Sequence, residues 1–380
     1  MSRGTVSDTI LIDATALQSE HRLRGVGVYL ANLIAGLEAE TTLGATYLTS
    51  RIGGELVTGV LPRARTTEFV RPHRPAQVYW LYNELVFRRA LNRIRPRVFF
   101  CPDFNGVVAN PFGRTVAVLY DLTAMKLPPG ALGPSQALSD WRWRAYARKL
   151  KAADHVIAVS TSAKKDAVAL LSIPPEKITV IHLGLDHDRF NPGCAGEQAE
   201  INPPYFLHVG GFNDNKNQAR VLRAFAAVAT AHRDVELHFS GTWHESDIAW
   251  LQKSAESLGV GDRVKHLGYV AAERLPMLYA NAAAFVFPSL EEGFGMPVLE
   301  AMACGTPVIT SDCSSLPEVA GDAALLVDPY SIEALGAAMS RLLDDPDERS
   351  RLRTAGLLRA ASFNWRITAQ RTAAVLLGSD

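Results

Sequence analysis

The stretch that decides the fold reads Phe287-Pro-Ser-Leu-Glu-Glu-Gly-Phe-Gly-Met-Pro-Val-Leu-Glu-Ala-Met-Ala-Cys-Gly305. Its pattern predicts the end of a strand, a glycine loop and a helix. Pro297 suits the first helical turn, where its missing N–H costs nothing, and Gly305 suits the position just past the helix end. A glycine loop between a strand and a helix is typical of parallel sheets covered by helices.

The same alternation of strand and helix runs through the rest of the chain. The first strand is expected at Thr9–Asp13 and a helix with apolar residues at helical spacing at Val26–Leu37. Further strands are predicted at Ala45–Leu48, Val98–Cys101, Thr115–Leu119, His155–Val159, Lys177–Ile181, Tyr205–Val209, Val235–Ser240, Val264–Leu267, Ala284–Phe287, Pro307–Thr310 and Ala324–Val327. The rhythm therefore predicts an α/β protein with parallel sheets.

Polar, turn-rich sequence after Asp186 marks a boundary between two domains. We expect a first α/β domain over residues 1–188, a linker over 189–203 and a second α/β domain over 204–364. A length of 380 residues fits two domains. Two such domains would form a cleft between the carboxyl ends of their strands, where open parallel sheets bind ligands.

Composition narrows the class of protein. Lys plus Arg and Asp plus Glu both number 39, so no overall field attracts nucleic acid and an anion has to be held by local features. The start of the chain lacks the features of a secretory signal, and no apolar run is long enough for a membrane helix. The four scattered cysteines lack metal-ligand spacing. We expect a cytoplasmic protein with no metal ion and no cofactor.

Two glutamates flank the glycine loop. Gly293 and Gly295 let the backbone approach a ligand closely, and the amides at the helix start favour a diphosphate. Glu300, expected in the first helical turn, can accept hydrogen bonds from ribose hydroxyls, and Glu292 would face a sugar. Taken singly, Glu300 could merely complement the helix dipole and Glu292 could be a solvated loop charge. Their shared placement around the glycine loop favours function.

Weaker signals lie in two other loops. Gly210-Gly-Phe-Asn-Asp-Asn-Lys-Asn217 follows a strand, and Lys216 could neutralise phosphates from the start of the next helix. The alternative is a solvent lysine beside an asparagine cap. Arg24-Gly-Val-Gly-Val28 is an incomplete Gly-x-Gly pattern that by itself indicates only a tight turn.

These residues resemble retaining glycosyltransferase family 4, which has the GT-B fold of two Rossmann-like domains facing across a cleft. The resemblance rests on the spacing of Glu292 and Glu300 and on the segments Ala301–Ile309, Ser315–Ala324 and His182–Asp186. It covers nearly the whole chain. It also implies that a last helix, residues 365–380, packs back on the first domain.

The resemblance implies roles for individual residues. Glu300 is expected to hold the ribose of a nucleotide diphosphate sugar, Glu292 to contact the transferred sugar, and Lys216 to hold the diphosphate. Further donor contacts are expected from Gly293, Phe294, Gly295 and Met296 in the glycine loop, from Gly25, Gly27 and Gly211 in the other two loops, and from Val270 in the nucleobase pocket.

Two positions depart from the family pattern. An arginine often follows the glycine before the phosphate lysine, and here that position is Gly211, so phosphate charge rests more heavily on Lys216. Many members carry His-Asp after a strand of the first domain, where this chain has Tyr120 and Asp121. Tyrosine can donate a hydrogen bond but does not share a proton near neutral pH as histidine does. Asp121 is the stronger candidate for a site contact, with a structural aspartate at a strand end as the alternative.

The resemblance implies a retaining, metal-independent hexosyltransferase that moves a sugar, with mannose from GDP-mannose as the candidate, to a saccharide or glycolipid in polysaccharide biosynthesis. A non-catalytic nucleotide-sugar-binding protein of the same fold is the alternative, and a nicotinamide-dependent dehydrogenase is a remote third. Peripheral contact with the inner face of the membrane is a hypothesis for the helix around Asp140–Lys151, whose apolar face includes Trp143, Tyr146 and Leu150. A core-facing helix is the commoner outcome for this pattern.

Overall fold

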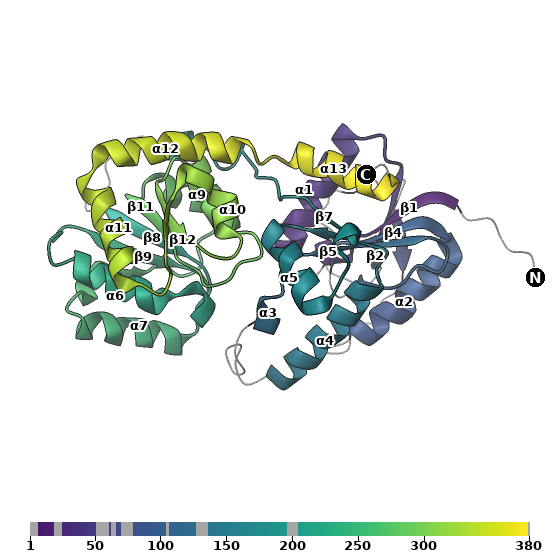
Figure 1. Ribbon diagram of the computed structural model, residues 1–380, viewed down its shortest axis with the longest axis horizontal. Coiled ribbons are helices and arrows are strands. Elements are labelled where there is room, and N and C mark those ends of the chain that lie inside the picture. Colours follow the sequence, from purple (N-terminus) through teal and green to yellow (C-terminus); the bar gives the residue numbers. More distant parts are fainter. Residues whose placement is uncertain are drawn as a thin grey trace, which may run out of the picture. The chain divides into compact units, whose positions relative to one another are not determined.

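The computed structural model describes residues 7–18, 25–50, 61, 66–69, 79–103, 106–126, 136–195 and 204–378. They form two compact units, and the chain passes from one to the other at Gly184–Leu185 and again at Asn364–Trp365. Each unit is a parallel sheet with helices on both faces (Figure 1). The α/β class predicted from the alternation of strands and helices is confirmed.

The first unit is built on a sheet with strand order β3-β2-β1-β4-β5-β6-β7. Its strands are β1 (Ser7–Asp13), β2 (Ala45–Ser50), β3 (Thr66–Phe69), β4 (Pro96–Cys101), β5 (Arg114–Leu119), β6 (His155–Ala158) and β7 (Ile178–Val180), all paired in parallel. The sequence predicted six of these and missed β3. That strand is the polar run Thr-Thr-Glu-Phe at the sheet edge, which carries little of the apolar pattern of a buried strand.

Helices of the first unit bury both faces of this sheet. They are α1 (Gly25–Glu40), α2 (Tyr79–Ile94), α3 (Thr123–Lys126), α4 (Gln136–Ala152), α5 (Thr161–Leu171) and α13 (Trp365–Leu377). The α2, α4 and α5 helices share one hydrophobic core with the strands, while α1 and α13 pack together (Figure 1). A Cβ atom on Gly36 would lie 2.8 Å from Cβ of Ala369, so only glycine lets α1 approach α13 this closely.

One face of α4 packs in the core, which is the alternative to the membrane hypothesis for this helix. Tyr146, Ala147 and Leu150 are buried in the core of the first unit, and the Tyr146 hydroxyl donates to the carbonyl oxygen of Val118 at 3.2 Å. The apolar face is therefore occupied, as the alternative of a core-facing helix predicted. The side chain of Trp143 lies outside the described residues. No helix in the described ranges is long and apolar enough to cross a membrane.

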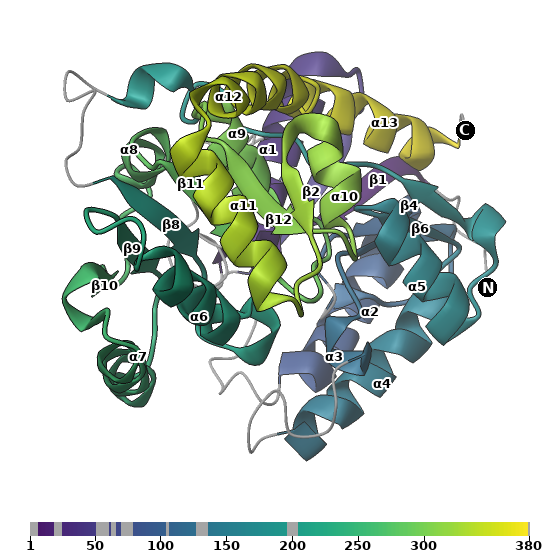
Figure 2. The same cartoon turned by 60° about the vertical axis from the view of Figure 1, so that its left-hand side comes forward.

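The second unit has the strand order β10-β9-β8-β11-β12-β13, which repeats the order of β3 to β6 in the first sheet and lacks a counterpart of β7. Its strands are β8 (Tyr205–Val209), β9 (Glu236–Ser240), β10 (Val264–His266), β11 (Ala284–Phe287), β12 (Val308–Ser311) and β13 (Leu325–Val327). Its helices are α6 (Gln218–Val228), α7 (Glu245–Ser257), α8 (Leu275–Ala280), α9 (Met296–Ala303), α10 (Leu316–Ala320), α11 (Ile332–Asp344) and α12 (Pro346–Ala361). The α6, α7 and α11 helices cover one face, and α9, α10 and α12 cover the other (Figures 1 and 2).

The described part of the predicted linker, residues 189–195, is grouped with the second unit. Residues 185–195 belong to the second unit, where Phe190 is buried with its ring centroid 6.3 Å from that of Tyr279. Arg189 donates to the carbonyl oxygen of Ala272 at 2.5 Å. This segment carries turn-forming residues and is irregular, yet it is packed. Residues 196–203 of the predicted linker lie outside the described ranges.

Candidate active site

Predicted site residues of the second unit gather at the carboxyl ends of β8 and β11. These neighbouring strands lie where the strand order reverses, because β9 and β10 extend to one side and β12 and β13 to the other. Doubly wound sheets bind ligands at this point, since the two connecting loops leave in opposite directions. Lys216 comes from the loop after β8 and Glu292 from the loop after β11.

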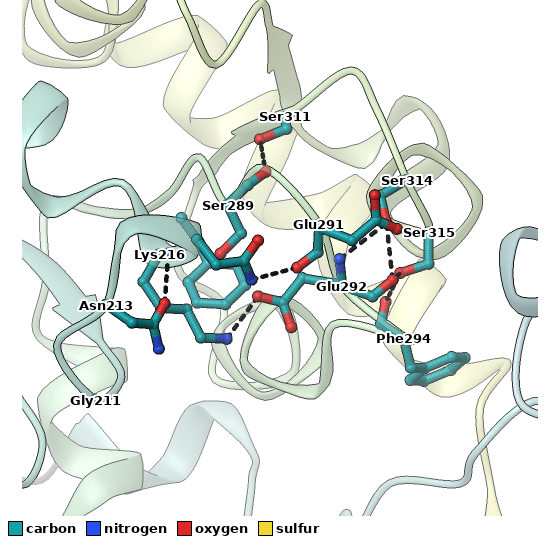
Figure 3. Close-up of polar contacts among 12 residues, drawn as sticks. Gly211, Asn213, Lys216, Ser289, Glu291, Glu292, Phe294, Ser311, Ser314 and Ser315 are labelled. Carbon is teal, nitrogen blue, oxygen red and sulfur yellow. Dashed lines mark hydrogen bonds and ion pairs between the residues drawn. The ribbon is translucent and has the colours of Figure 1, made fainter. Parts of the chain in front are cut away.

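An ion pair joins the two loops. Lys216 Nζ lies 2.5 Å from Glu292 Oε1 and 4.8 Å from the ring centroid of Phe287, the last residue of β11 (Figure 3). The two side chains are 21% and 14% exposed, so the pair is largely shielded from water but still reachable. Lys216 is therefore no solvent lysine. The predicted asparagine cap is also present, because Asn213 Oδ1 accepts from the Lys216 N–H at 3.0 Å.

The glycine loop leads directly into α9. Gly295 has φ of +108°, and a Cβ atom there would lie 2.7 Å from Leu316, so both the conformation and the space require glycine. Phe294 is buried, and its ring packs edge-to-face with that of Phe363 at 5.9 Å between centroids. The helix begins at Met296, and Gly305 follows its end with φ of +79°, as predicted.

Glu300 lies in the second turn of α9, not in the first as predicted, because the helix begins one residue before Pro297. Its Oε2 atom accepts a 3.0 Å hydrogen bond from the buried hydroxyl of Tyr279. Burial raises the pKa of Glu300, while the Tyr279 hydrogen bond and the charge of Arg189 work against that rise. Within the described part of the chain, Oε1 has no hydrogen bond.

Two other residues predicted to contact the donor are Gly211 and Val270. Gly211 is exposed, and its carbonyl oxygen accepts from Gln218 Nε2 at 2.8 Å, which ties the loop after β8 to the start of α6. Val270 is half-buried in the loop that follows β10. Their roles toward a ligand stay predictions.

Tyr120 of the first unit makes contacts of a structural kind. Its hydroxyl donates to the carbonyl oxygen of Pro102 at 3.0 Å, and its ring meets that of Tyr29 edge-on at 5.5 Å between centroids. Burial raises the pKa of Tyr120 well above its ordinary value, with a smaller contribution from Tyr29. The phenol therefore keeps its proton at neutral pH.

Asp121 accepts a hydrogen bond at the start of a short helix. Its Oδ1 atom accepts from the N–H of Thr123, the first residue of α3, at 2.9 Å. This contact is the one expected of a structural aspartate at a strand end, the alternative to a catalytic contact.

The two N-terminal glycines lie at the start of α1, and their roles toward a ligand stay predictions. Gly25 is the first residue of α1 with φ of +41°, and a Cβ atom there would meet nothing within 4 Å. Gly27 is buried in the same turn. Arg24, which precedes them in the pattern, lies outside the described residues.

Sequence reasoning missed the residues that hold the glutamates in place. Tyr279 supports Glu300, and Asn215, Ser314 and Ser315 hydrogen-bond the loop that carries Glu292. These contacts join positions far apart in the chain, so no local pattern marks them. The sequence offered two signals: Asn215 lies in the loop singled out at Gly210–Asn217, and Ser315 lies in a segment that carried the family resemblance.

Comparison with known proteins places the chain in a family. Residues 23–189 match the model described as Glycosyltransferase Family 4, and residues 196–359 match that of Glycosyl transferases group 1. O-antigen chain mannosyltransferase B of Escherichia coli is 30% identical over 289 residues, which cover 73% of each chain. The protein belongs to this glycosyltransferase family, and the resemblance stated from the sequence is confirmed.

Other relatives match over shorter spans. MMP alpha-(1->4)-mannosyltransferase of Mycolicibacterium hassiacum is 33% identical over 58% of this chain, and O-antigen chain mannosyltransferase RfbU of Salmonella typhimurium is 31% identical over 53%. The matches span about half the length of these two relatives, 53% and 54%.

Solved structures share the fold. Sucrose-phosphate synthase from Thermosynechococcus elongatus superposes with a TM-score of 0.77 at 20% identity, over 98% of this chain and 100% of that one. Anabaena HepE in complex with UDP and glucose gives a TM-score of 0.74 at 18% identity, over 98% and 100%. The fold is that of the GT-B glycosyltransferases, as predicted.

Proposed function

We propose that the protein transfers mannose from GDP-mannose to a saccharide or glycolipid acceptor in polysaccharide assembly, with retention of the anomeric configuration. The observation that carries this proposal is the Lys216–Glu292 ion pair at the carboxyl ends of β8 and β11. Glu300 lies on α9, the helix that follows the glycine loop after Glu292. The choice of mannose rests on the names of the relatives, among them two O-antigen chain mannosyltransferases.

Departure of the diphosphate is the step that Lys216 would assist. Negative charge grows on the leaving phosphate oxygens as the bond to the sugar breaks, and a lysine ammonium together with the amides at the start of α9 would stabilise it. The dipole of α9 adds to this effect, since its positive end is the end at Met296. Lys216 supplies a positive charge at this position, and the proposal therefore needs no metal ion.

Glu292 would act on the sugar. Positive charge develops on the ring as the diphosphate leaves, and a carboxylate beside it stabilises that charge. The acceptor hydroxyl would attack from the side on which the diphosphate departs, and retention would follow without a protein nucleophile. Glu300 would hold the ribose through the Oε1 atom that Tyr279 leaves open.

Nucleotide binding tests the donor site first. Thermal unfolding of wild type and Glu300→Ala would be followed with GDP, UDP and dTDP. A ligand at about a hundredfold excess over its dissociation constant adds roughly 2.7 kcal/mol of stability. The proposal predicts that GDP stabilises wild type most and that the effect is lost in the variant. Stabilisation by UDP alone would overturn the choice of GDP-mannose but keep the site.

Turnover separates an enzyme from a non-catalytic binding protein. Incubation with GDP-mannose and α-linked mannose oligosaccharides should release GDP and form a product whose new bond is α by proton NMR, as in the donor. A β-linked product would contradict retention. Stabilisation by GDP without any release from GDP-mannose, across a panel of acceptors, would favour the non-catalytic alternative.

A further inference from the structure

The loop that carries Glu292 is held from two sides at a single peptide group. Asn215 Nδ2 donates to the carbonyl oxygen of Glu291 at 2.6 Å, and the N–H of Glu292 donates to Ser314 Oγ at 2.9 Å (Figure 3). These two groups belong to the same amide, between Glu291 and Glu292. Because a trans peptide is planar and its C=O and N–H point in opposite directions, partners on both sides fix the plane.

The two partners come from different strands of the sheet. Asn215 lies in the loop after β8, where its own carbonyl oxygen also accepts from the Leu290 N–H at 2.8 Å. Ser314 lies in the loop after β12 with φ of 60°, a left-handed conformation uncommon for serine. The loop after β11 is thus clamped by the loops of both neighbouring strands.

Ser314 also contacts the side chain of Glu291 and the backbone of Glu292. Its hydroxyl lies 2.9 Å from Glu291 Oε1 and 2.8 Å from the carbonyl oxygen of Glu292, so its single proton can serve either acceptor. Glu291 is held on the Ser314 side, whereas the Glu292 carboxylate reaches Lys216. The clamp thereby determines which of two consecutive glutamates faces the lysine.

We infer that Asn215 and Ser314 are positioning residues that fix the Glu291–Glu292 peptide and so aim the Glu292 carboxylate at the site. The inference rests on the proposed function, in which Glu292 contacts the transferred sugar. Neither residue touches the reacting atoms in this scheme. Both residues act by setting the direction of the Glu292 side chain.

The chain offers two matched controls. Ser311 belongs to the same segment, is fully buried and donates to the carbonyl oxygen of Ser289 at 2.6 Å, so Ser311→Ala removes a similar hydrogen bond that does not touch the clamped peptide. Ser314→Gly removes the hydroxyl but suits the left-handed backbone better than Ser314→Ala. Backbone strain and loss of the hydroxyl are therefore tested separately.

The test measures kcat and KM for GDP release from GDP-mannose. Ser314→Ala, Ser314→Gly and Asn215→Ala should each lower kcat by about tenfold to a hundredfold, because misplacing a catalytic group costs factors of this size. Their donor KM should stay within about threefold of wild type, since the nucleotide contacts remain. Ser311→Ala should unfold earlier on heating yet keep the kcat of wild type.

A double-mutant cycle decides whether Ser314 acts through Glu292. In a Glu292→Gln background, Ser314→Ala should change kcat by less than about twofold. The inference is overturned if Ser314→Ala alone leaves kcat unchanged, or if it lowers kcat by the same factor in both backgrounds. If Glu292→Gln has the same kcat as wild type, the proposed role of Glu292 is refuted instead.

A crystal structure of Ser314→Ala gives a readout independent of turnover. The inference predicts that the Glu291–Glu292 peptide rotates and that the Glu292 carboxylate leaves Lys216. An unchanged ion pair and peptide would overturn it, whatever the activity of the wild type.

Discussion

The two units share one strand order over six strands, yet the residues at the ends of these strands make different kinds of contact. In the second unit, Lys216 and Glu292 converge from two loops and are held there by further side chains. In the first unit, Tyr120 and Asp121 follow β5 but contact Pro102 and Thr123 in the manner of structural residues. Two units of the same fold therefore need not both carry reacting groups. We expect the reacting groups of the protein in the second unit.

The largest effect should come from removing the charge of Lys216. Lys216→Met keeps most of the side-chain length but cannot stabilise a leaving diphosphate, so kcat/KM should fall about a hundredfold to a thousandfold. Asn213→Ala is the control, because it removes the cap of the same loop and leaves the ammonium in place. GDP release measures both. A loss of less than about tenfold in Lys216→Met would mean that the diphosphate is stabilised elsewhere.

Glu300→Gln should separate binding from stability. The substitution should abolish the roughly 2.7 kcal/mol that saturating GDP adds, because an amide replaces a doubly accepting carboxylate. Without ligand the variant should be at least as stable as wild type at pH 7, since folding buries the carboxylate and raises its pKa above the ordinary 4.5.

The pH dependence follows from the direction of this shift. A carboxyl group whose pKa is raised by folding binds more protons in the folded state, so the free energy of unfolding decreases as pH rises above about 4.5. Glutamine does not titrate, so it makes no such pH-dependent contribution to the free energy of unfolding. The difference in melting temperature between Glu300→Gln and wild type should therefore grow from pH 4 to pH 7. A difference that stays constant or shrinks would contradict the burial of an ionisable Glu300.

A smaller effect is expected at Asp121. Asp121→Ala removes the hydrogen bond to the N–H of Thr123 and should lower the free energy of unfolding by about 1 kcal/mol, whereas Asp121→Asn retains an accepting oxygen and should restore most of it. Chemical denaturation measures both changes. Turnover should stay near that of wild type in each variant. A large loss of kcat in Asp121→Asn, with stability intact, would make Asp121 a site residue and break the contrast between the units.

The smallest effect is expected at Gly25. Its φ of +41° disfavours an L side chain although the space is open, so Gly25→Ala should cost about 0.5–1 kcal/mol of stability. Stabilisation by GDP should be unchanged if Gly25 serves only the start of α1. Loss of that stabilisation, measured by thermal unfolding, would mean that Gly25 of the first unit contributes to donor binding.

Much of this organisation could be predicted from the sequence because it is encoded locally. Strands such as β8 and β11 are apolar runs bounded by turn residues, and the glycine loop with its helix is a contiguous pattern. The polar strand β3 lacks that pattern at the sheet edge. Residues 189–195 were predicted to belong to a linker because their irregular sequence carries turn residues, whereas the packing of this segment depends on distant residues such as Tyr279 and Ala272.

The supporting residues could not be predicted for a related reason. Ser314 and Asn215 act on a peptide group that is distant in the chain from both, and only the pairing of β8, β11 and β12 brings them together. The sequence showed that Tyr120 stands where many family members have histidine, but it did not show what the Tyr120 side chain contacts. Its hydroxyl is directed to Pro102, a contact that follows from the packing of β4 beside β5.

The central claim is that the chemistry lies with Glu292 and not with Tyr120, and one assay tests it directly. GDP release from GDP-mannose would be measured side by side for wild type, Glu292→Gln and Tyr120→Phe. We predict that Glu292→Gln lowers kcat about a hundredfold or more, and that Tyr120→Phe stays within about threefold of wild type. A severe loss in Tyr120→Phe together with a nearly intact Glu292→Gln would contradict the account.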